Sequence, residues 1–412
     1  MKLLLQNAAA NAVGSIFDRG GMVALTAILS GALSAEAFRQ FGQFQLTLSM
    51  LAALSSVGVA VSVSRLFAEH RGGTSEELHL AGTMWALSLI AALAFGGLAT
   101  ALGLISGGAV VHTVAIAAGV FVVTAGIVAG GGVLGLALFR HAAAVSVVAA
   151  CVLMGVGAVA AASRSLPLAL ASVVAAYTVS TVLMTAIVLR KVPAHAIFTR
   201  KVLSADSIAR AASMIGPLAL VTLLASSSNW LLGQILHFSP NPTLDFAGFI
   251  IGLQWFAIVQ FVPGMISRAI FPEMVRWGLN GGQGAGQKEL GLSLLLSVGV
   301  AVAVFLVILI GSPIFAKAYD AGSVGNGIVL VAYSAAALPQ CLANLFGNLL
   351  VASKNGAVWA GLTVEWFVFL LVAGGLLHRL GAIGVAIALA IAGLLLAVRA
   401  FSHLQRRGLI RI

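Results

Sequence analysis

A charged pair, Asp18 and Arg19, lies inside an apolar stretch near the start of the chain. Polar residues precede it at helical spacing, so one helical face carries Asn7, Asn11, Ser15 and Asp18. A charge inside a membrane costs roughly 2.5–3.5 kcal/mol on insertion scales, so it usually faces a cavity or a partner. The pair therefore has two interpretations. It forms a cavity wall, with a substrate-binding Arg19 and an ion-coupling Asp18, or it is a self-neutralising pair that docks two helices together.

Two further arginines, Arg65 and Arg268, each follow a serine at the end of a long apolar stretch. As membrane anchors they would hold their charge among the cytosolic lipid headgroups. As binding residues they would grip an anionic headgroup, because the planar guanidinium donates paired hydrogen bonds to phosphate. The residues alone leave both interpretations open.

Uncharged polar side chains also recur within the apolar stretches of both halves. The amides selected as substrate-binding candidates, besides Asn11, are Asn229, Gln254, Gln340 and Asn344. A similar stripe at i+4 steps carries Tyr177, Thr181 and Thr185, with Ser180 beside it. Such groups suit a sugar-contacting lumen, and they also bond membrane helices together at about 0.6 kcal/mol per hydrogen bond. For any single residue we favour bonding between helices, whereas the recurrence of such stripes on several helices of both halves favours a polar lumen collectively.

A lone carboxylate, Glu365, stands beside Trp366 in another apolar stretch. It is an ion-coupling candidate alongside Asp18, because an ionisable group inside the membrane suits a proton or sodium carrier. It also suits a structural carboxylate bonded to a neighbouring helix, the interpretation that we favour.

The elements that position these residues follow from composition. Of 412 residues, 61% are hydrophobic and 8% charged, whereas soluble domains carry about 25% charged residues. The mean hydropathy is +1.11. These values exclude a soluble enzyme, a DNA-binding protein and a disordered scaffold. The net charge of +11 lies in short breaks between apolar stretches, which indicates the positive-inside rule and no nucleic-acid partner.

Twelve stretches reach the roughly 20 apolar residues that a membrane span needs. They lie near 8–32, 42–66, 80–105, 110–138, 142–163, 167–189, 211–237, 245–270, 290–312, 324–352, 356–377 and 381–400. With both termini cytosolic, 17 of the 22 Lys and Arg residues fall on the inner side and four on the outer side. This bias predicts the orientation.

The basic break at 191–210 divides the spans six and six. It predicts an N-terminal bundle (1–190), a cytosolic linker (191–210), a C-terminal bundle (211–400) and a basic cytosolic tail (401–412). The second and eighth spans share a start of two phenylalanines that enclose a glycine, Phe41-Gly42-Gln43-Phe44 and Phe246-Ala247-Gly248-Phe249, and a Ser-Arg end. Parallel repeats are typical of transporters with a substrate path between the halves. The predicted fold is therefore an all-α polytopic membrane protein of two parallel-repeat six-helix bundles around a central cavity.

No motif for nucleophilic catalysis, metal binding or cofactor binding occurs, and no loop is long enough for a catalytic domain. We therefore expect neither an enzyme nor a cofactor. The spacings Gly126-x-x-x-Gly130 and Gly131-x-x-x-Gly135 predict close helix packing without chemistry.

Several stretches resemble a known family. The segments 42–70 (GQFQLTLSMLAALSSVGVAVSVSRLFAEH) and 227–276, with its W-L-L-G and F-P-E motifs, resemble the second helix and the seventh and eighth helices of polysaccharide flippases. ASKNGAVWAGL and LGAIGVAIALAIAG fit their last two helices. The family is the polysaccharide transporter branch of the multidrug/oligosaccharidyl-lipid/polysaccharide exporters, which includes the O-antigen (Wzx-type) flippases.

The resemblance implies a flippase in the bacterial inner membrane that serves cell-surface polysaccharide biosynthesis. It would move undecaprenyl-pyrophosphate-linked oligosaccharide across the bilayer by alternating access, alongside a polysaccharide polymerase and other pathway membrane proteins. The cavity and gate arginines of the family would be Arg19, Arg65 and Arg268. The chain departs from the family pattern at the helix entries, where Phe44 and Phe249 replace a frequent Tyr.

A second functional hypothesis is a proton- or sodium-coupled multidrug or organic-cation antiporter, with Asp18 as the ion site. The absence of carboxylates from the seventh and tenth spans weakens it. A membrane-embedded glycosyltransferase would need an acidic motif or a sizeable outer loop, and the sequence has neither.

Overall fold

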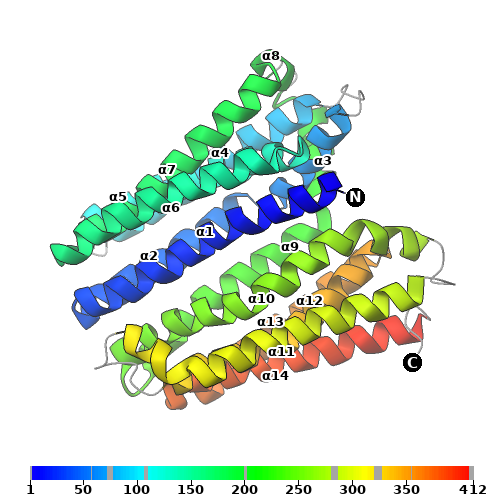
Figure 1. Ribbon diagram of the computed structural model, residues 1–412. Helices are drawn as coiled ribbons and strands as arrows, with labels where there is room; N and C mark the ends of the chain where they lie inside the picture. Colours follow the sequence, from blue (N-terminus) through cyan, green and yellow to red (C-terminus); the bar gives the residue numbers. More distant parts are fainter. Residues whose placement is uncertain are drawn as a thin grey trace. The chain divides into compact units, whose positions relative to one another are not determined.

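The structure is a computed structural model of the chain (Figure 1). It describes the backbone of residues 2–56, 58–71, 78–105, 110–198, 202–279, 286–319, 327–353 and 355–407. Within these ranges, side chains are described except those of residues 2–12, 15, 61, 69, 71, 102–105, 215–218, 265, 267–279, 286–294 and 318. The described residues are helical almost throughout and contain no β-strand. The predicted all-α class is confirmed.

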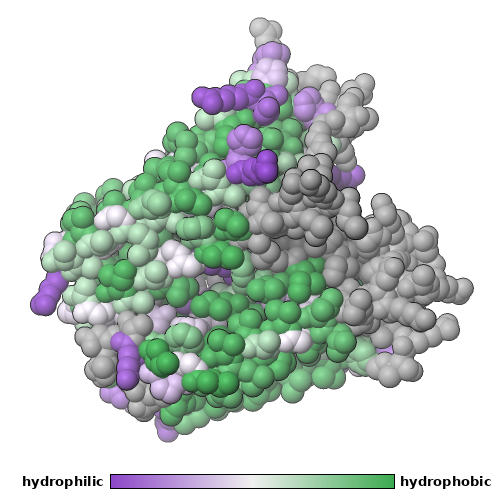
Figure 2. Space-filling view, viewed as in Figure 1, coloured by the Kyte–Doolittle hydropathy of each residue, from purple (hydrophilic) through white to green (hydrophobic). Residues whose placement is uncertain are grey.

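The helices present apolar side chains outward. Ile310 is 78% exposed and Leu376 is 76% exposed, and Figure 2 shows a largely hydrophobic face with hydrophilic residues mainly near the helix ends. Nine segments of the described chain are long and apolar enough to cross a membrane. Helices satisfy their backbone hydrogen bonds internally, as lipid requires. The chain is a multi-pass membrane protein, as its composition predicts.

The chain forms two compact units, Met1–Ser226 and Ser227–Ile412. Unit 1 contains α1 (Lys2–Ala32), α2 (Ala35–Ser55), α3 (Val59–Arg71), α4 (Leu78–Ile105), α5 (Val110–Gly135), α6 (Phe139–Ala162), α7 (Leu166–Lys191), α8 (Ala194–Ile197) and most of α9 (Ala205–Ile235). In this unit α1 packs along α6, and α5 contacts α2, α3, α4 and α7. The helix α5 is therefore the central element of unit 1.

The predicted span 42–66 is broken into α2 and α3, so the expectation of one continuous helix is wrong. Gly58 adopts a positive φ of 65°, a left-handed conformation that glycine tolerates and that ends a helix. The Ser55 hydroxyl donates to the Leu51 carbonyl at 2.8 Å, and the Ser56 hydroxyl donates to the Ala52 carbonyl at 2.6 Å. These bonds satisfy carbonyls in the last turn of α2.

Close packing through the glycines of α5 is confirmed at three of the four predicted positions. Gly135 passes against the Ser64 carbonyl of α3, which leaves no room for a Cβ. A Cβ added at Gly131 would lie 2.7 Å from the Ala60 carbonyl oxygen of α3, and one added at Gly126 would lie 2.5 Å from the Thr181 hydroxyl of α7. Gly130, in contrast, faces open space. The small residues of α5 let α3 and α7 approach its backbone.

The predicted linker, 191–210, contains α8 and the first turn of α9, and α8 packs on α4. Gly82 of α4 passes against the Ile197 carbonyl, which leaves no room for a Cβ. The Trp85 and Phe198 rings lie 5.8 Å apart between centroids. The boundary between the two units falls later, within α9.

Unit 2 contains the end of α9, η1 (Leu236–Phe238), α10 (Pro242–Leu279), α11 (Gly286–Ala318), α12 (Ile328–Ala352), α13 (Gly356–Leu377), η2 (His378–Leu380) and α14 (Gly381–Arg406). Here α12 contacts α10, α11 and α14, and α13 packs on α14. Unit 1 has the same scheme, because α5 contacts α3, α4 and α7 while α6 packs on α7. The shared scheme supports the predicted internal repeat, with α5 and α12 as equivalent central helices.

Candidate functional site

A cavity of about 280 Å³ lies between α1, α6 and α7 of unit 1. Its polar lining comprises Asp18 of α1 with Tyr177 and Ser180 of α7. The apolar lining residues are Phe17, Met22, Ala149, Ala150, Leu153, Val173 and Ala176. The cavity therefore brings one carboxylate together with two hydroxyl-bearing side chains in otherwise apolar surroundings.

The carboxylate is held by a buried serine on the neighbouring helix. The Ser146 hydroxyl of α6 donates to Asp18 Oδ2 at 3.0 Å, and Ser146 is only 5% exposed. A hydrogen bond to an ionised group contributes roughly 1.5–3 kcal/mol. Ser146 therefore orients the Asp18 carboxylate, whose oxygens can still accept a bond from a ligand in the cavity.

Small residues explain why α1 and α6 come close enough for this bond. A Cβ added at Gly14 would lie 3.0 Å from Ala143 Cα and 3.4 Å from Ser146 Oγ. One turn after Asp18, a Cβ added at Gly21 would lie 3.5 Å from Ala150 Cβ. The helices thus meet through glycine and alanine on both sides of Asp18, and this approach places the carboxylate within reach of the serine.

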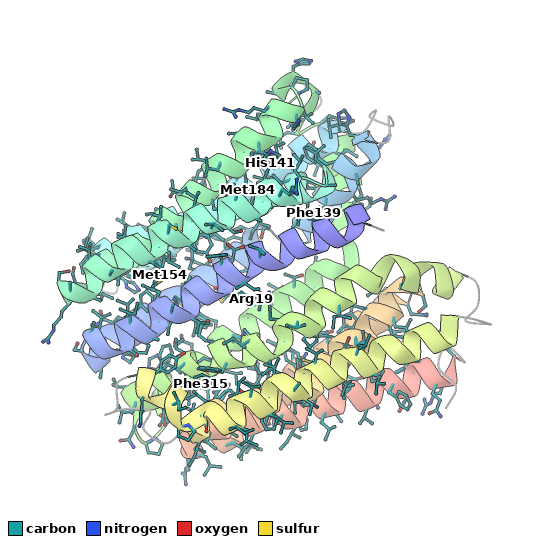
Figure 3. All side chains as sticks on the ribbon, viewed as in Figure 1. Arg19, Phe139, His141, Met154, Met184 and Phe315 are labelled. Carbon is teal, nitrogen blue, oxygen red and sulfur yellow. The ribbon has the colours of Figure 1, made fainter. Side chains whose placement is uncertain are left out.

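Arg19 follows Asp18 on α1 and is labelled on that helix in Figure 3. The Arg19 side chain interacts electrostatically with the Asp18 carboxylate, and Arg19 is itself exposed. Asp18 bonds to α6 and lines the cavity. This arrangement favours the cavity-wall interpretation of the Asp18–Arg19 pair.

The chemistry open to this cavity is cation binding. Carboxylate and hydroxyl oxygens are ligands for a proton or a hard cation such as sodium, and the Tyr177 ring adds a face that attracts organic cations. In the described part of the chain, no three His, Cys, Asp or Glu side chains come together as metal ligands. Asp18 is the acidic side chain that lines this cavity, which makes it the candidate group for binding a positive charge.

Two of the four predicted amides of unit 2, Gln340 and Asn344, form a short hydrogen-bonded chain with Gln260, which was not among the selected candidates. Gln340 Nε2 donates to Asn344 Oδ1 at 3.3 Å within α12, and Asn344 Nδ2 donates to Gln260 Oε1 of α10 at 3.5 Å. At the ends of this chain, Gln260 Nε2 and Gln340 Oε1 are buried without a partner among the described residues. A spare donor and a spare acceptor therefore remain in this amide chain.

Other amide candidates lie apart from this chain. Asn229 and Gln254 are half-buried on α9 and α10. The Asn11 side chain lies outside the described residues. In unit 1, Thr181 lies on the same stripe of α7 as Tyr177. Its hydroxyl donates to the Val122 carbonyl at 2.9 Å and bonds α7 to α5. One polar stripe thus contributes Tyr177 to the cavity and Thr181 to a contact between helices.

The two gate candidates lie in different units, Arg65 on α3 and Arg268 on α10. Arg65 is exposed near the end of α3, and the side chain of Arg268 lies outside the described residues. Their role as a phosphate gate therefore stays a prediction.

Glu365 is paired with an arginine. Arg399 Nη2 of α14 lies 3.0 Å from Glu365 Oε2 and 3.1 Å from Oε1 of the same carboxylate, and both side chains are about half exposed. The pair favours the structural interpretation of Glu365 over the ion-carrier one.

Ser146 is the site residue that the sequence analysis missed. A single serine in an alanine-rich helix carries no distinctive signal. The available clue was that Gly14 and Gly21 flank Asp18 at helical spacing, which indicates a closely packed partner for that face of α1.

No protein-family model matches the sequence, and no curated protein is significantly similar to it. Solved structures are similar in fold. An inward-facing multidrug resistance MATE family transporter of the MOP superfamily superposes with a TM-score of 0.74 at 15% identity, covering 97% of this chain and 98% of that one. An outward-facing MATE family transporter gives 0.69 at 16% identity, with 100% and 97% covered.

A third structure is a MOP superfamily transporter from Pyrococcus furiosus, described as having a binding pocket of reverse polarity that suggests a different function. It gives a TM-score of 0.62 at 14% identity, covering 98% of this chain and 95% of that one. The chain therefore has the two-bundle helical fold of MATE family transporters. The similarity in fold does not distinguish the flippase branch, which the sequence motifs resemble, from the multidrug branch.

Proposed function

We propose that this protein is a cation-coupled membrane antiporter that works by alternating access and uses Asp18 as its coupling group. The observation that carries the proposal is the cavity of about 280 Å³ in unit 1, where the Ser146 hydroxyl holds the Asp18 carboxylate. The fold adds support, because similar structures are multidrug resistance transporters solved in inward-facing and outward-facing conformations.

Antiport follows if a proton or sodium ion and an organic cation compete for one carboxylate. The ionised Asp18 attracts the organic cation, while Tyr177 and the apolar lining contact its uncharged part. Binding of the coupling ion neutralises Asp18 and releases the organic cation. An opposing ion gradient then drives export, because the two ligands bind to Asp18 on opposite sides of the membrane.

Replacing Asp18→Asn should abolish gradient-driven uptake of a fluorescent organic cation, such as ethidium, into proteoliposomes of the purified protein. The amide keeps the shape of the side chain and removes the charge for which both ions compete. We expect a loss of at least tenfold, since a charge-assisted contact of roughly 1.5–3 kcal/mol disappears. Uptake would be measured under an imposed pH gradient and, separately, under a sodium gradient.

The matched control is Asp206→Asn, which removes an exposed carboxylate that is paired with Arg210 in the first turn of α9. This variant should transport as the parent does. Full gradient-driven transport by the Asp18→Asn protein would contradict the proposal.

A second candidate is the lipid-linked oligosaccharide flippase. It is favoured by the uncharged amide chain of unit 2, whose spare donor and acceptor suit the hydroxyl groups of a glycan. In this case Arg19, Arg65 and Arg268 would bind the pyrophosphate of an undecaprenyl-linked oligosaccharide. The protein would act in the bacterial inner membrane beside a polysaccharide polymerase.

The flippase hypothesis predicts a defect in the transfer of undecaprenyl-linked saccharide between the leaflets. In a deletion strain complemented with the Arg65→Gln/Arg268→Gln double variant, undecaprenyl-linked saccharide should accumulate in the cytosolic leaflet. An impermeant glycosidase added to spheroplasts would report the leaflet, with wild-type complementation as the control. Normal leaflet distribution in both the deletion strain and the double variant would reject the flippase and leave the antiporter.

A further inference from the structure

The end of α14, which the predicted orientation places on the cytosolic side, carries a group of cations that the cavity does not use. On α14, Arg399, His403 and Arg406 follow at 0, +4 and +7, which places them along one helical face. Arg399 and Arg406 are exposed, and His403 is half-buried. Glu365 is the single acidic residue of segment 355–407, so this face has a surplus of positive charge.

The neighbouring helix leaves room beside these cations. Gly361 lies one turn before Glu365 on the same face of α13, and a Cβ added at Gly361 would meet nothing within 4 Å. Because α13 and α14 are consecutive antiparallel helices, the chain before Glu365 lies beside the chain after Arg399. The space at Gly361 is therefore next to the turn that carries His403.

The depth of the cations suits the headgroup region of a bilayer. Arg399 lies seven residues before Arg406, or about 10 Å along the helix. The predicted orientation puts the end of α14 on the cytosolic side, and long arginine side chains can reach the headgroups from this depth. The last two turns of α14 thus place cations at the level of lipid phosphates.

We propose that the surface formed by Arg399, His403, Arg406 and Gly361 binds the phosphate-bearing headgroup of an anionic phospholipid in the cytosolic leaflet. The Arg399 guanidinium is held by Glu365 through one terminal nitrogen, Nη2, so its other N–H groups can donate to a lipid phosphate. The acyl chains lie along the apolar exterior of the two helices. This inference is independent of the transported substrate.

The test uses the delipidated, purified full-length protein, with binding of phosphatidylglycerol and phosphatidylcholine of identical acyl chains measured by native mass spectrometry. The wild type should bind phosphatidylglycerol more tightly. Each basic residue near an anionic surface is worth about fivefold in affinity, so Arg399→Gln/Arg406→Gln should weaken phosphatidylglycerol binding about 25-fold. Phosphatidylcholine binding should stay unchanged.

The matched control is Arg379→Gln, which removes an exposed arginine of η2 at the opposite ends of the same two helices and should keep the preference. Glu365→Gln should strengthen phosphatidylglycerol binding, since it removes the competing carboxylate. If the double variant fails to fold, Arg406→Gln alone should still lower the affinity about fivefold.

Two results would overturn the proposal. One is a phosphatidylglycerol preference that survives the double variant, or that falls equally in the Arg379→Gln control. The other is displacement of the lipid by millimolar inorganic phosphate, which would show that the face binds free phosphate.

Discussion

At the scale of single residues, the proposed ion site depends on how Ser146 holds Asp18. Replacing Ser146→Ala removes the hydroxyl that donates to the Asp18 carboxylate while keeping the small side chain that the α1–α6 contact needs. We expect the KM for an organic cation to rise about tenfold, since a hydrogen bond to an ionised group contributes roughly 1.5–3 kcal/mol. Initial rates in proteoliposomes at increasing substrate concentration would measure it.

The control for this variant is Ser172→Ala on α7, whose buried hydroxyl donates to the Ala169 carbonyl of its own helix at 2.7 Å. It should leave the KM unchanged. Ser146→Thr, which restores the hydroxyl, should recover part of the affinity. A KM that is equal in the Ser146→Ala and wild-type proteins would mean that the serine has no part in substrate binding.

At the scale of elements, the sequence predicted the long helices well because each apolar stretch is bounded by charge, proline or glycine. It missed the break between α2 and α3, since Ser55, Ser56 and Gly58 interrupt the apolar stretch only briefly and a positive φ is not encoded in the hydrophobic pattern. It found the close packing of α5 from glycine spacing, because that spacing is itself the physical cause of the approach.

Polar residues were harder to assign from the sequence than helices. A stripe at helical spacing shows that residues share a face, but not which neighbour that face meets. Tyr177 therefore proved to line the cavity, whereas Thr181, one turn later, bonds to α5. The partners of Asp18 and Glu365, namely Ser146 and Arg399, come from distant parts of the chain and required the tertiary contacts.

At the scale of the whole molecule, an internal repeat and a charge bias together define how the chain crosses the membrane. Units 1 and 2 share one scheme of helix contacts, with α5 and α12 as the central helices. An even number of spans in each unit returns the chain to the same side of the membrane. The seventeen-to-four distribution of Lys and Arg then predicts that the turn between α6 and α7 lies outside and α8 lies inside.

This orientation is testable with two single cysteines in unit 1. In a background that lacks Cys151 and Cys341, Ser163→Cys reports the exposed turn after α6, and Ala194→Cys reports exposed α8. An impermeant maleimide should label the first in intact spheroplasts and the second only after permeabilisation. Labelling of Ala194→Cys from outside would reverse the orientation, move the basic end of α14 to the outer leaflet, and contradict a cytosolic lipid site there.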